Sequence, residues 1–180
     1  AYTAPHTPLQ APRREIEKML PFYNGKSPHA IASKRLEKQK LLGIVPPAAK
    51  LGMAGKFNPE GYEKTSAKRK DYIAECMAAY AAQIAIMDRG IGRILASLER
   101  HRLSDNTIVM FLSDNGATAE MPQNNKNKKT TLPTGPLGEV GCRDGYGPMW
   151  AAVSNTWFLY TSDAADDTQC VDLEGGGITA

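Results

Sequence analysis

Asp114 and Asn115 are the two residues of this sequence whose side chains best fit metal chemistry. The Asp114 carboxylate and the Asn115 side-chain carbonyl supply two hard oxygen donors, which suit Ca²⁺ or Mg²⁺ rather than Zn²⁺. One charged and one neutral ligand leave the ion net positive, so it can hold an anionic substrate or polarise a bound oxygen. The alternative is a simple turn, because Asn115 and Gly116 both tolerate positive φ.

His6 is the second candidate, and it lies in the proline-rich segment Pro5-His6-Thr7-Pro8. Because proline fixes φ, this segment would hold the imidazole in place at little entropic cost. Histidine can donate a hydrogen bond to an anion or transfer a proton near neutral pH. The alternative is a surface histidine in a stiff loop. We interpret the other two histidines, at a helix start and a helix end, as capping or solvated groups: His29 and His101.

The composition limits the class of protein. With 180 residues, 42% hydrophobic and 23% charged, the chain is long enough for one domain with a sizeable core. Its net charge of +3 is too small to indicate a nucleic-acid partner or an anionic membrane surface. No apolar run approaches the ~20 residues that span a bilayer. Three cysteines without CxxC spacing indicate neither a disulfide framework nor a zinc site.

The candidate metal pair directly follows a predicted strand. Residues 107–112, TIVMFL, form an almost wholly apolar run rich in β-formers, which predicts a strand buried on both faces of a parallel sheet. Upstream, apolar residues from Ile73 to Leu98 recur at steps of four and three, which predicts one long helix. Ligand sites of open α/β sheets lie at the carboxyl ends of strands. The order of elements therefore places Asp114 and Asn115 where such a fold does its chemistry.

Two shorter helices are predicted near the N-terminus. Residues 13–20 and 29–42 each have the composition of a short helix, and Gly43 closes the second. Residues 48–66 are mixed in composition, and we expect them to be irregular. In the long helix, Gly90 and Gly92 each cost roughly 1 kcal/mol against alanine, which indicates close packing against a sheet.

A long polar loop is predicted at residues 120–148, which are rich in Gly, Pro, Asn and Lys. A loop of that length inside a compact domain is usually functional or disordered. Its lysines could attract an anionic substrate, and the alternative is a solvated loop surface. The lysines concerned are Lys126, Lys128 and Lys129.

Three segments occur in one order: residues 2–12 (YTAPHTPLQAP), 77–95 (MAAYAAQIAIMDRGIGRIL) and 103–117 (LSDNTIVMFLSDNGA). Together they resemble the sulfatase family, of the arylsulfatase type, within the alkaline-phosphatase-like superfamily. Residues 146–156 are similar to the stretch that follows in the bacterial arylsulfatase branch. Three ordered motifs are far more specific than any one of them, so the resemblance favours a metal-ligand role for Asp114-Asn115 over a turn.

The resemblance implies an α/β fold, part of an alkaline-phosphatase-like sandwich with a mostly parallel sheet flanked by helices. By position it implies that Asp114 and Asn115 bind one Ca²⁺ ion. It also implies that His6 is a catalytic, substrate-binding residue that contacts the sulfate or the leaving-group oxygen. The activity implied is that of a sulfuric ester hydrolase acting on a small-molecule or carbohydrate sulfate ester, with formylglycine, made from a Cys or Ser, as nucleophile. The family's expected location is periplasmic or secreted.

Parts of the family's site are missing from this sequence. It contains no Cys-x-Pro-x-Arg or Ser-x-Pro-x-Arg, the first acidic metal pair or the upstream Lys/His motif. It also begins without a start Met or a signal peptide. We therefore expect an internal piece of a sulfatase that is inactive by itself and binds calcium weakly at best. The alternatives are a phosphate or phosphonate ester hydrolase of the same superfamily and a non-catalytic α/β binding module.

The chain divides into two unequal parts. Residues 1–157 are expected to form the C-terminal part of the core of a sulfatase catalytic domain. Residues 158–180 show no apolar periodicity and look like a translated sequencing-library adapter, so we expect a non-native or disordered tail. After Thr156 the arylsulfatase branch continues with Pro, Phe, Arg and a substrate-contacting Lys, whereas this chain continues with Trp157. The alternative is a genuine polar C-terminal segment.

Overall fold

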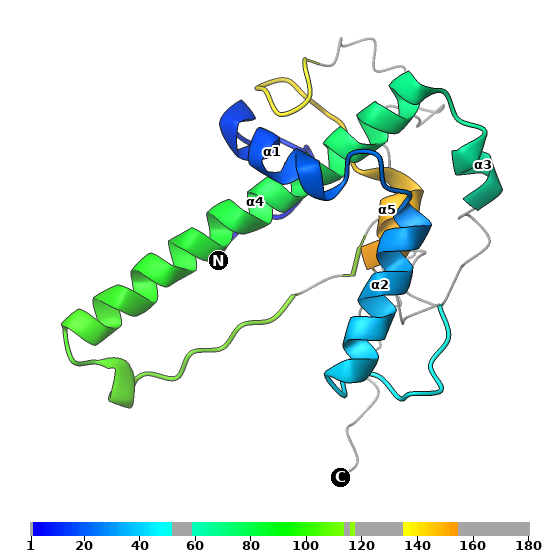
Figure 1. Cartoon of the computed structure of the whole chain (residues 1–180). Coiled ribbons are helices and arrows are strands. Elements are labelled where there is room, and N and C mark those ends of the chain that lie inside the picture. Colours follow the sequence, from blue (N-terminus) through cyan, green and yellow to red (C-terminus); the bar gives the residue numbers. More distant parts are fainter. Residues whose placement is uncertain (1, 52–58, 114–115, 118–134, 155–180) are drawn as a thin grey trace.

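One long helix organises the structure. The computed structural model describes residues 2–51, 59–113, 116–117 and 135–154. Within these ranges, α4 (Ala67–Arg100) runs for 34 residues, and α1 (Arg13–Met19) crosses it (Figure 1). A short 3-10 helix, η1 (Leu20–Phe22), continues α1. None of the helices in these ranges is long and apolar enough to cross a membrane. The predicted tail at residues 158–180 lies outside the described residues.

The helix α4 is confirmed where its apolar stripe predicted it. Ser66 begins it, since its side-chain oxygen accepts a hydrogen bond from the Arg69 backbone N–H. Along the N-terminal half, Ile73 and Met77 of the stripe are buried beside several alanines. In the C-terminal half, four large apolar side chains remain 36–53% exposed: Ile84, Ile86, Ile94 and Leu95. The apolar periodicity therefore extends along the whole of α4, whereas packing against other described elements buries mainly the N-terminal half of the helix.

Helices α2 (Pro28–Leu41) and α5 (Gly147–Ser154) lie side by side near the N-terminal half of α4 (Figure 1). The guanidinium of Arg35 on α2 donates a hydrogen bond to the Val153 carbonyl oxygen at 2.7 Å, which joins the two helices. Because α5 follows the long polar loop, this contact brings a late part of the chain onto an early one. Residues 147–154 thus form an ordered helix in this late part of the chain.

The ends of α2 are set by local interactions. At its start, the Ser27 side chain accepts a hydrogen bond from the Ala30 backbone N–H. At its end, Gly43 has a φ of +68°, which glycine adopts without a steric penalty. The helices predicted at residues 13–20 and 29–42 are both confirmed, with bounds shifted by one residue.

The core forms where α1, α2, α5 and the first half of α4 meet. Trp150 is fully buried, and its ring meets Tyr23 edge to face with ring centroids 5.6 Å apart. Leu9 and Ile16, both 0% exposed, reach this core from the N-terminal segment and from α1. Residues from both ends of the described chain therefore share one hydrophobic cluster.

A buried carboxylate joins α1 to α4. Glu15 is 5% exposed, and its carboxylate oxygens lie 3.0 Å from the Lys18 ammonium and 2.9 Å from the Arg89 guanidinium. The hydrogen bond from Lys18 is the main influence that lowers the pKa of Glu15, with Arg89 acting in the same direction against the effect of burial. The charges therefore favour the ionised carboxylate in the folded chain.

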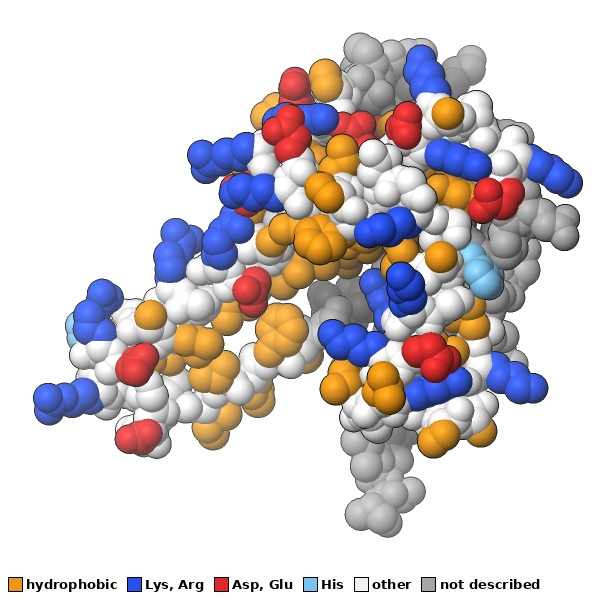
Figure 2. All heavy atoms as spheres, viewed as in Figure 1, with side chains coloured by type: hydrophobic (Ala, Val, Ile, Leu, Met, Phe, Trp, Pro, Cys, Tyr) orange, Lys and Arg blue, Asp and Glu red, His pale blue; other side chains and the backbone are white. Residues whose placement is uncertain are grey.

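The strand predicted at residues 107–112 is not confirmed. The segment is extended, but residues 108–112 form no hydrogen bond with another described residue, and their side chains are 58–88% exposed. Figure 1 shows the segment running beneath the far half of α4, and Figure 2 shows apolar side chains on the molecular surface there. A strand needs a neighbour to satisfy its backbone N–H and C=O groups, and the described ranges supply none.

The expected mostly parallel sheet is accordingly unconfirmed. The described ranges are helical apart from loops, turns and extended segments, and they contain one isolated parallel bridge, between Gln10 and Gly138. The prediction that residues 107–112 are buried on both faces is wrong for this structure. Burial of an apolar strand depends on the elements stacked on its two faces, which a local pattern cannot provide.

Two further expectations are corrected. A five-residue helix, α3 (Pro59–Glu63), lies in the stretch at 48–66 that was expected to be irregular. The described end of the polar loop, residues 135–146, is ordered and partly buried, with Cys142, Asp144 and Tyr146 in the interior. These residues were predicted from composition alone, which misses the side chains that a loop turns inward.

Close packing at the helix glycines is confirmed at one position. A Cβ atom built on Gly90 would lie 2.8 Å from the Tyr2 hydroxyl oxygen, whereas one built on Gly92 meets nothing within 4 Å. The neighbour at Gly90 is the N-terminal segment and not a sheet. Gly90 therefore makes room for an aromatic ring, and Gly92 has no such role among the described contacts.

Candidate functional site

His6 lies on a non-helical N-terminal segment, bent at Pro5, Thr7 and Pro8, that passes beside α4. Its side chain is exposed, and its Nδ1 is within hydrogen-bond distance of the Thr7 carbonyl oxygen. Because a carbonyl oxygen only accepts, this contact requires the proton on Nδ1. The neutral imidazole then presents Nε2 to solvent as an acceptor, and the imidazolium presents it as a donor.

Gln83 of α4 holds the backbone of this segment. Its side-chain Nε2 donates to the carbonyl oxygens of His6 at 3.2 Å, Pro8 at 3.1 Å and Gln10 at 3.3 Å. Gln83 is 7% exposed, so these hydrogen bonds are largely shielded from water. The buried face of α4 thus carries a polar group aimed at the chain that bears His6.

The polar loop supplies a second set of anchors. The Leu9 backbone N–H donates to the Asp144 carbonyl oxygen at 2.9 Å, and the Ala11 backbone N–H donates to the Gly138 carbonyl oxygen at 3.0 Å. In return, the Gly138 N–H donates to the Leu9 carbonyl oxygen at 3.2 Å. The segment that follows His6 is therefore held between α4 and residues 138–144.

Asp144 connects these anchors to α4 through its side chain. It is 5% exposed, and its Oδ2 accepts a hydrogen bond from the Tyr72 hydroxyl at 2.7 Å, while Oδ1 has no partner among the described residues. Burial, and next the bond to Asp144, raise the pKa of Tyr72 above its usual range. Tyr72 therefore stays protonated and donating, which fixes Asp144 against the helix.

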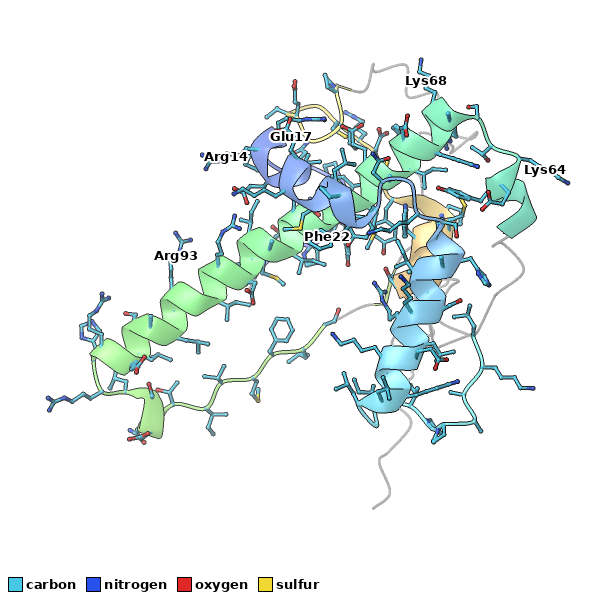
Figure 3. The ribbon with its side chains drawn as sticks, in the orientation of Figure 1. Arg14, Glu17, Phe22, Lys64, Lys68 and Arg93 are labelled. Carbon is cyan, nitrogen blue, oxygen red and sulfur yellow. The ribbon has the colours of Figure 1, made fainter. Side chains whose placement is uncertain are left out.

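A groove of about 500 Å³ lies between the N-terminal segment and the exposed half of α4. Apolar side chains make up most of its wall, and Arg93 also lines it. Figure 3 shows the Arg93 side chain projecting from α4. Gln83 and Gln10 line it as well, but His6 does not. The groove and the imidazole are therefore separate features of the same surface.

Asp114 and Asn115, the predicted metal ligands, lie outside the described residues, as does the lysine-rich part of the loop. The residues on either side of the pair, Ser113 and Gly116, are exposed. Among the described residues no group of three His, Cys, Asp or Glu side chains could hold a metal ion. The structure thus positions His6, while the relation between His6 and the Asp114-Asn115 pair stays a prediction.

Sequence reasoning missed the residues that hold the His6 segment. Gln83 could have been found as a polar residue on a helix face that otherwise carries Ala79, Ala82 and Met77, since buried polar groups require partners. Asp144 gave no such signal, because it lies in a polar loop with no periodicity. Both act over long sequence separations, 77 residues for the contact between Gln83 and His6.

The family model and the similar proteins found by comparison all point to one family. A family model described as Sulfatase matches residues 1–137, which include His6, Asp114 and Asn115. The chain is 34% identical over 161 residues to an uncharacterized sulfatase of Schizosaccharomyces pombe, covering 83% of this chain and 28% of that protein. It is 33% identical over 162 residues to an arylsulfatase of Klebsiella aerogenes, covering 86% of this chain and 34% of that protein.

A third relative matches over a shorter stretch. This uncharacterized sulfatase of Escherichia coli is 44% identical over 43 residues, which is 24% of this chain and 8% of that protein. The chain thus spans about a third of the length of these two longer-matching relatives, the sulfatase of Schizosaccharomyces pombe and the arylsulfatase of Klebsiella aerogenes. Since the family model and both extended matches agree over most of its residues, the chain belongs to the sulfatase family.

Proposed function

We propose that the whole protein hydrolyses sulfate esters, using a formylglycine nucleophile and one Ca²⁺ ion. The observation that carries the proposal is the 33% identity to an arylsulfatase over 86% of this chain. The family match over residues 1–137 supports it, because that range contains all three predicted site residues. The substrate class we propose is a small-molecule or carbohydrate sulfate ester.

Asp114 and Asn115 would hold the calcium ion. Their donor set fits it, since a carboxylate and an amide carbonyl are hard oxygen ligands. When bound, the ion would supply positive charge to the oxygens of the sulfate group. The formylglycine precursor must lie in sequence beyond these 180 residues, which contain no Cys-x-Pro-x-Arg or Ser-x-Pro-x-Arg.

His6 would act on the sulfate or on the leaving-group oxygen. Its exposed imidazole has Nε2 free of the Thr7 contact, so the protonated ring can donate one hydrogen bond outward. The Thr7 carbonyl favours the tautomer with the proton on Nδ1. The outward Nε2 then accepts a hydrogen bond when the ring is neutral and donates one when the ring is protonated. The segment that Gln83 and residues 138–144 hold would keep this nitrogen in place.

The test is hydrolysis of an aryl sulfate by the full-length protein. We expect 4-nitrophenyl sulfate to be cleaved far faster than 4-nitrophenyl phosphate, and mass spectrometry of the nucleophile peptide to show the oxidised residue. His6→Ala and Asp114→Ala should each lower kcat by 10²-fold or more, by analogy with loss of a general acid or an electrostatic stabiliser. His29→Ala serves as a matched control. Preferential phosphate cleavage would instead favour the phosphatase alternative.

The 180-residue chain alone provides a separate test of the metal site. It should not hydrolyse an aryl sulfate, because it holds no nucleophile of the required type. Calcium should raise its melting temperature, in proportion to the logarithm of the calcium concentration above Kd, and Asp114→Ala should abolish the effect. No calcium effect in either protein would leave the non-catalytic binding module as the better reading.

A further inference from the structure

We propose that Gln83 is the positioning residue for His6: it holds the backbone of residues 6–10 so that the imidazole projects from one fixed place. The proposal rests on the proposed function only in treating His6 as a site residue. The three hydrogen bonds from Gln83 Nε2, to the carbonyl oxygens of His6, Pro8 and Gln10, stand independently of it.

The spacing of the three acceptors suits one donor group. The backbone bends at Thr7 and Pro8, and the Gln10 N–H donates to the Pro8 carbonyl oxygen at 2.9 Å. This bent path brings the carbonyl oxygens of His6, Pro8 and Gln10 within reach of one side chain. The amide Nε2 carries two hydrogens, and three acceptors within 3.3 Å mean that one hydrogen is shared. A single buried side chain can therefore fix the path of five residues.

The chemistry requires a donor at this position. Three carbonyl oxygens can only accept, so the orientation of the amide is dictated, with Nε2 toward the segment. Gln83 Oε1 is left buried without a hydrogen-bond partner among the described residues, which is a cost the three contacts offset. Pro5, directly before His6, and Pro8, two positions after it, have no backbone N–H with which to anchor the segment themselves.

No other side chain of the described ranges does this for His6. The contacts from residues 138–144 begin at Leu9, three positions further along the chain. Upstream, Tyr2 packs over Gly90. Between these two points the His6 carbonyl receives its hydrogen bond from Gln83, so removal of the amide would free the stretch that carries the imidazole.

The experiment is nuclear magnetic resonance of the histidine rings in the 180-residue chain. Gln83→Met keeps a long unbranched side chain and removes the donor, and Gln83→Glu keeps the shape but offers only acceptors. The control is Gln39→Met on α2, where the glutamine Oε1 is likewise buried without a hydrogen-bond partner among the described residues. His29 and His101, which are remote in sequence from the segment, serve as internal references.

We expect both Gln83 variants to shift and broaden the His6 ring signals, while those of His29 and His101 stay in place. Amide hydrogen exchange at Gln10 and Ala11 should become roughly tenfold faster or more. The Gln39→Met control should change neither readout. Identical His6 signals in the unsubstituted chain and in Gln83→Met would overturn the proposal.

Two safeguards keep the result decisive. If both Gln83 variants fail to fold, nuclear Overhauser contacts between the Gln83 amide protons and residues 6–10 in the unsubstituted chain decide the question, and their absence refutes the proposal. In the full-length protein, Gln83→Met should lower kcat more than it raises KM. A full-length protein with no sulfatase activity, together with shifted His6 signals, would reject the function and retain Gln83 as the anchor.

Discussion

Trp150 donates its indole N–H to the backbone carbonyl oxygen of Ile73 at 2.8 Å, across 77 residues of sequence. This single contact joins α5 to α4 at the centre of the core, and the Trp150 side chain is fully buried. An indole buried without an acceptor would carry an unsatisfied donor, so the Ile73 carbonyl makes that burial possible. The position of α5 therefore depends on one polar contact as well as on apolar packing.

Replacement of this indole should weaken the fold. Trp150→Phe removes the hydrogen bond and leaves unfilled volume, which together should lower the free energy of unfolding by about 2–3 kcal/mol. Urea unfolding followed by far-UV circular dichroism would measure the change. As a control, Phe22→Leu alters a side chain that is 62% exposed and labelled in Figure 3, and it should stay within about 0.5 kcal/mol. Equal effects of the two substitutions would contradict the assigned contact.

The two helix glycines should respond differently to alanine. At Gly92 an added Cβ meets nothing within 4 Å, so Gly92→Ala should stabilise α4 by up to about 1 kcal/mol. At Gly90 the Cβ would lie 2.8 Å from the Tyr2 hydroxyl, so the same gain in propensity must be set against displacement of the ring. Thermal unfolding of both variants would show Gly90→Ala as the less stable of the two. A matching rise for both would mean that Tyr2 moves aside without cost.

The ion pairs of Glu15 should make stability depend on pH. The pKa of Glu15 is lowered in the folded chain, first by the hydrogen bond from Lys18, so the carboxylate contributes stability above its unfolded pKa near 4.5. That contribution is lost as the pH falls from about 4.5 through the lower folded pKa. Glu15→Gln should therefore be less stable than the parent at pH 7 and should lose less stability on acidification.

The matched control for that experiment is Glu17→Gln. Glu17, which is labelled in Figure 3, is on the same helix and its side chain is 59% exposed. It pairs with Arg13 at the surface. An exposed pair contributes little, so this variant should follow the pH dependence of the parent chain. If Glu17→Gln flattened the profile as much as Glu15→Gln, the buried carboxylate could not be the source of the pH dependence.

The thiol of Cys76 should resist alkylation in the folded chain. Burial raises the pKa of Cys76 to about 12 from an ordinary value of 9.0, so only a small fraction is thiolate at pH 8. Iodoacetamide labelling, with the Cys76 peptide followed by mass spectrometry, should be at least 10²-fold slower in the native chain than in urea. Rapid native labelling would show that this part of α4 opens frequently.

Much of the local structure could be predicted from sequence. The period of apolar residues identified α4, and Gly43 marked the end of α2, because helix formation and termination depend on residues a few positions apart. The candidate residues His6, Asp114 and Asn115 also came from sequence, through local motifs whose order matches the sulfatase family. Such motifs can be recognised in the sequence because the residues that make up each motif are close together along the chain.

The contacts that join distant residues depend on how the helices and loops pack together. Only the fold shows that Gln83 binds the backbone at His6, that Trp150 binds Ile73, and that Asp144 connects the polar loop to α4. The apolar run at residues 107–112 was read as a buried strand and is exposed instead, since β-pairing and burial need partners that a local pattern does not contain. Short-range interactions along the chain therefore specify the helices and the motifs. Tertiary packing specifies which polar groups form hydrogen bonds with one another, because hydrogen bonding and burial depend on the distances between residues that are far apart along the chain.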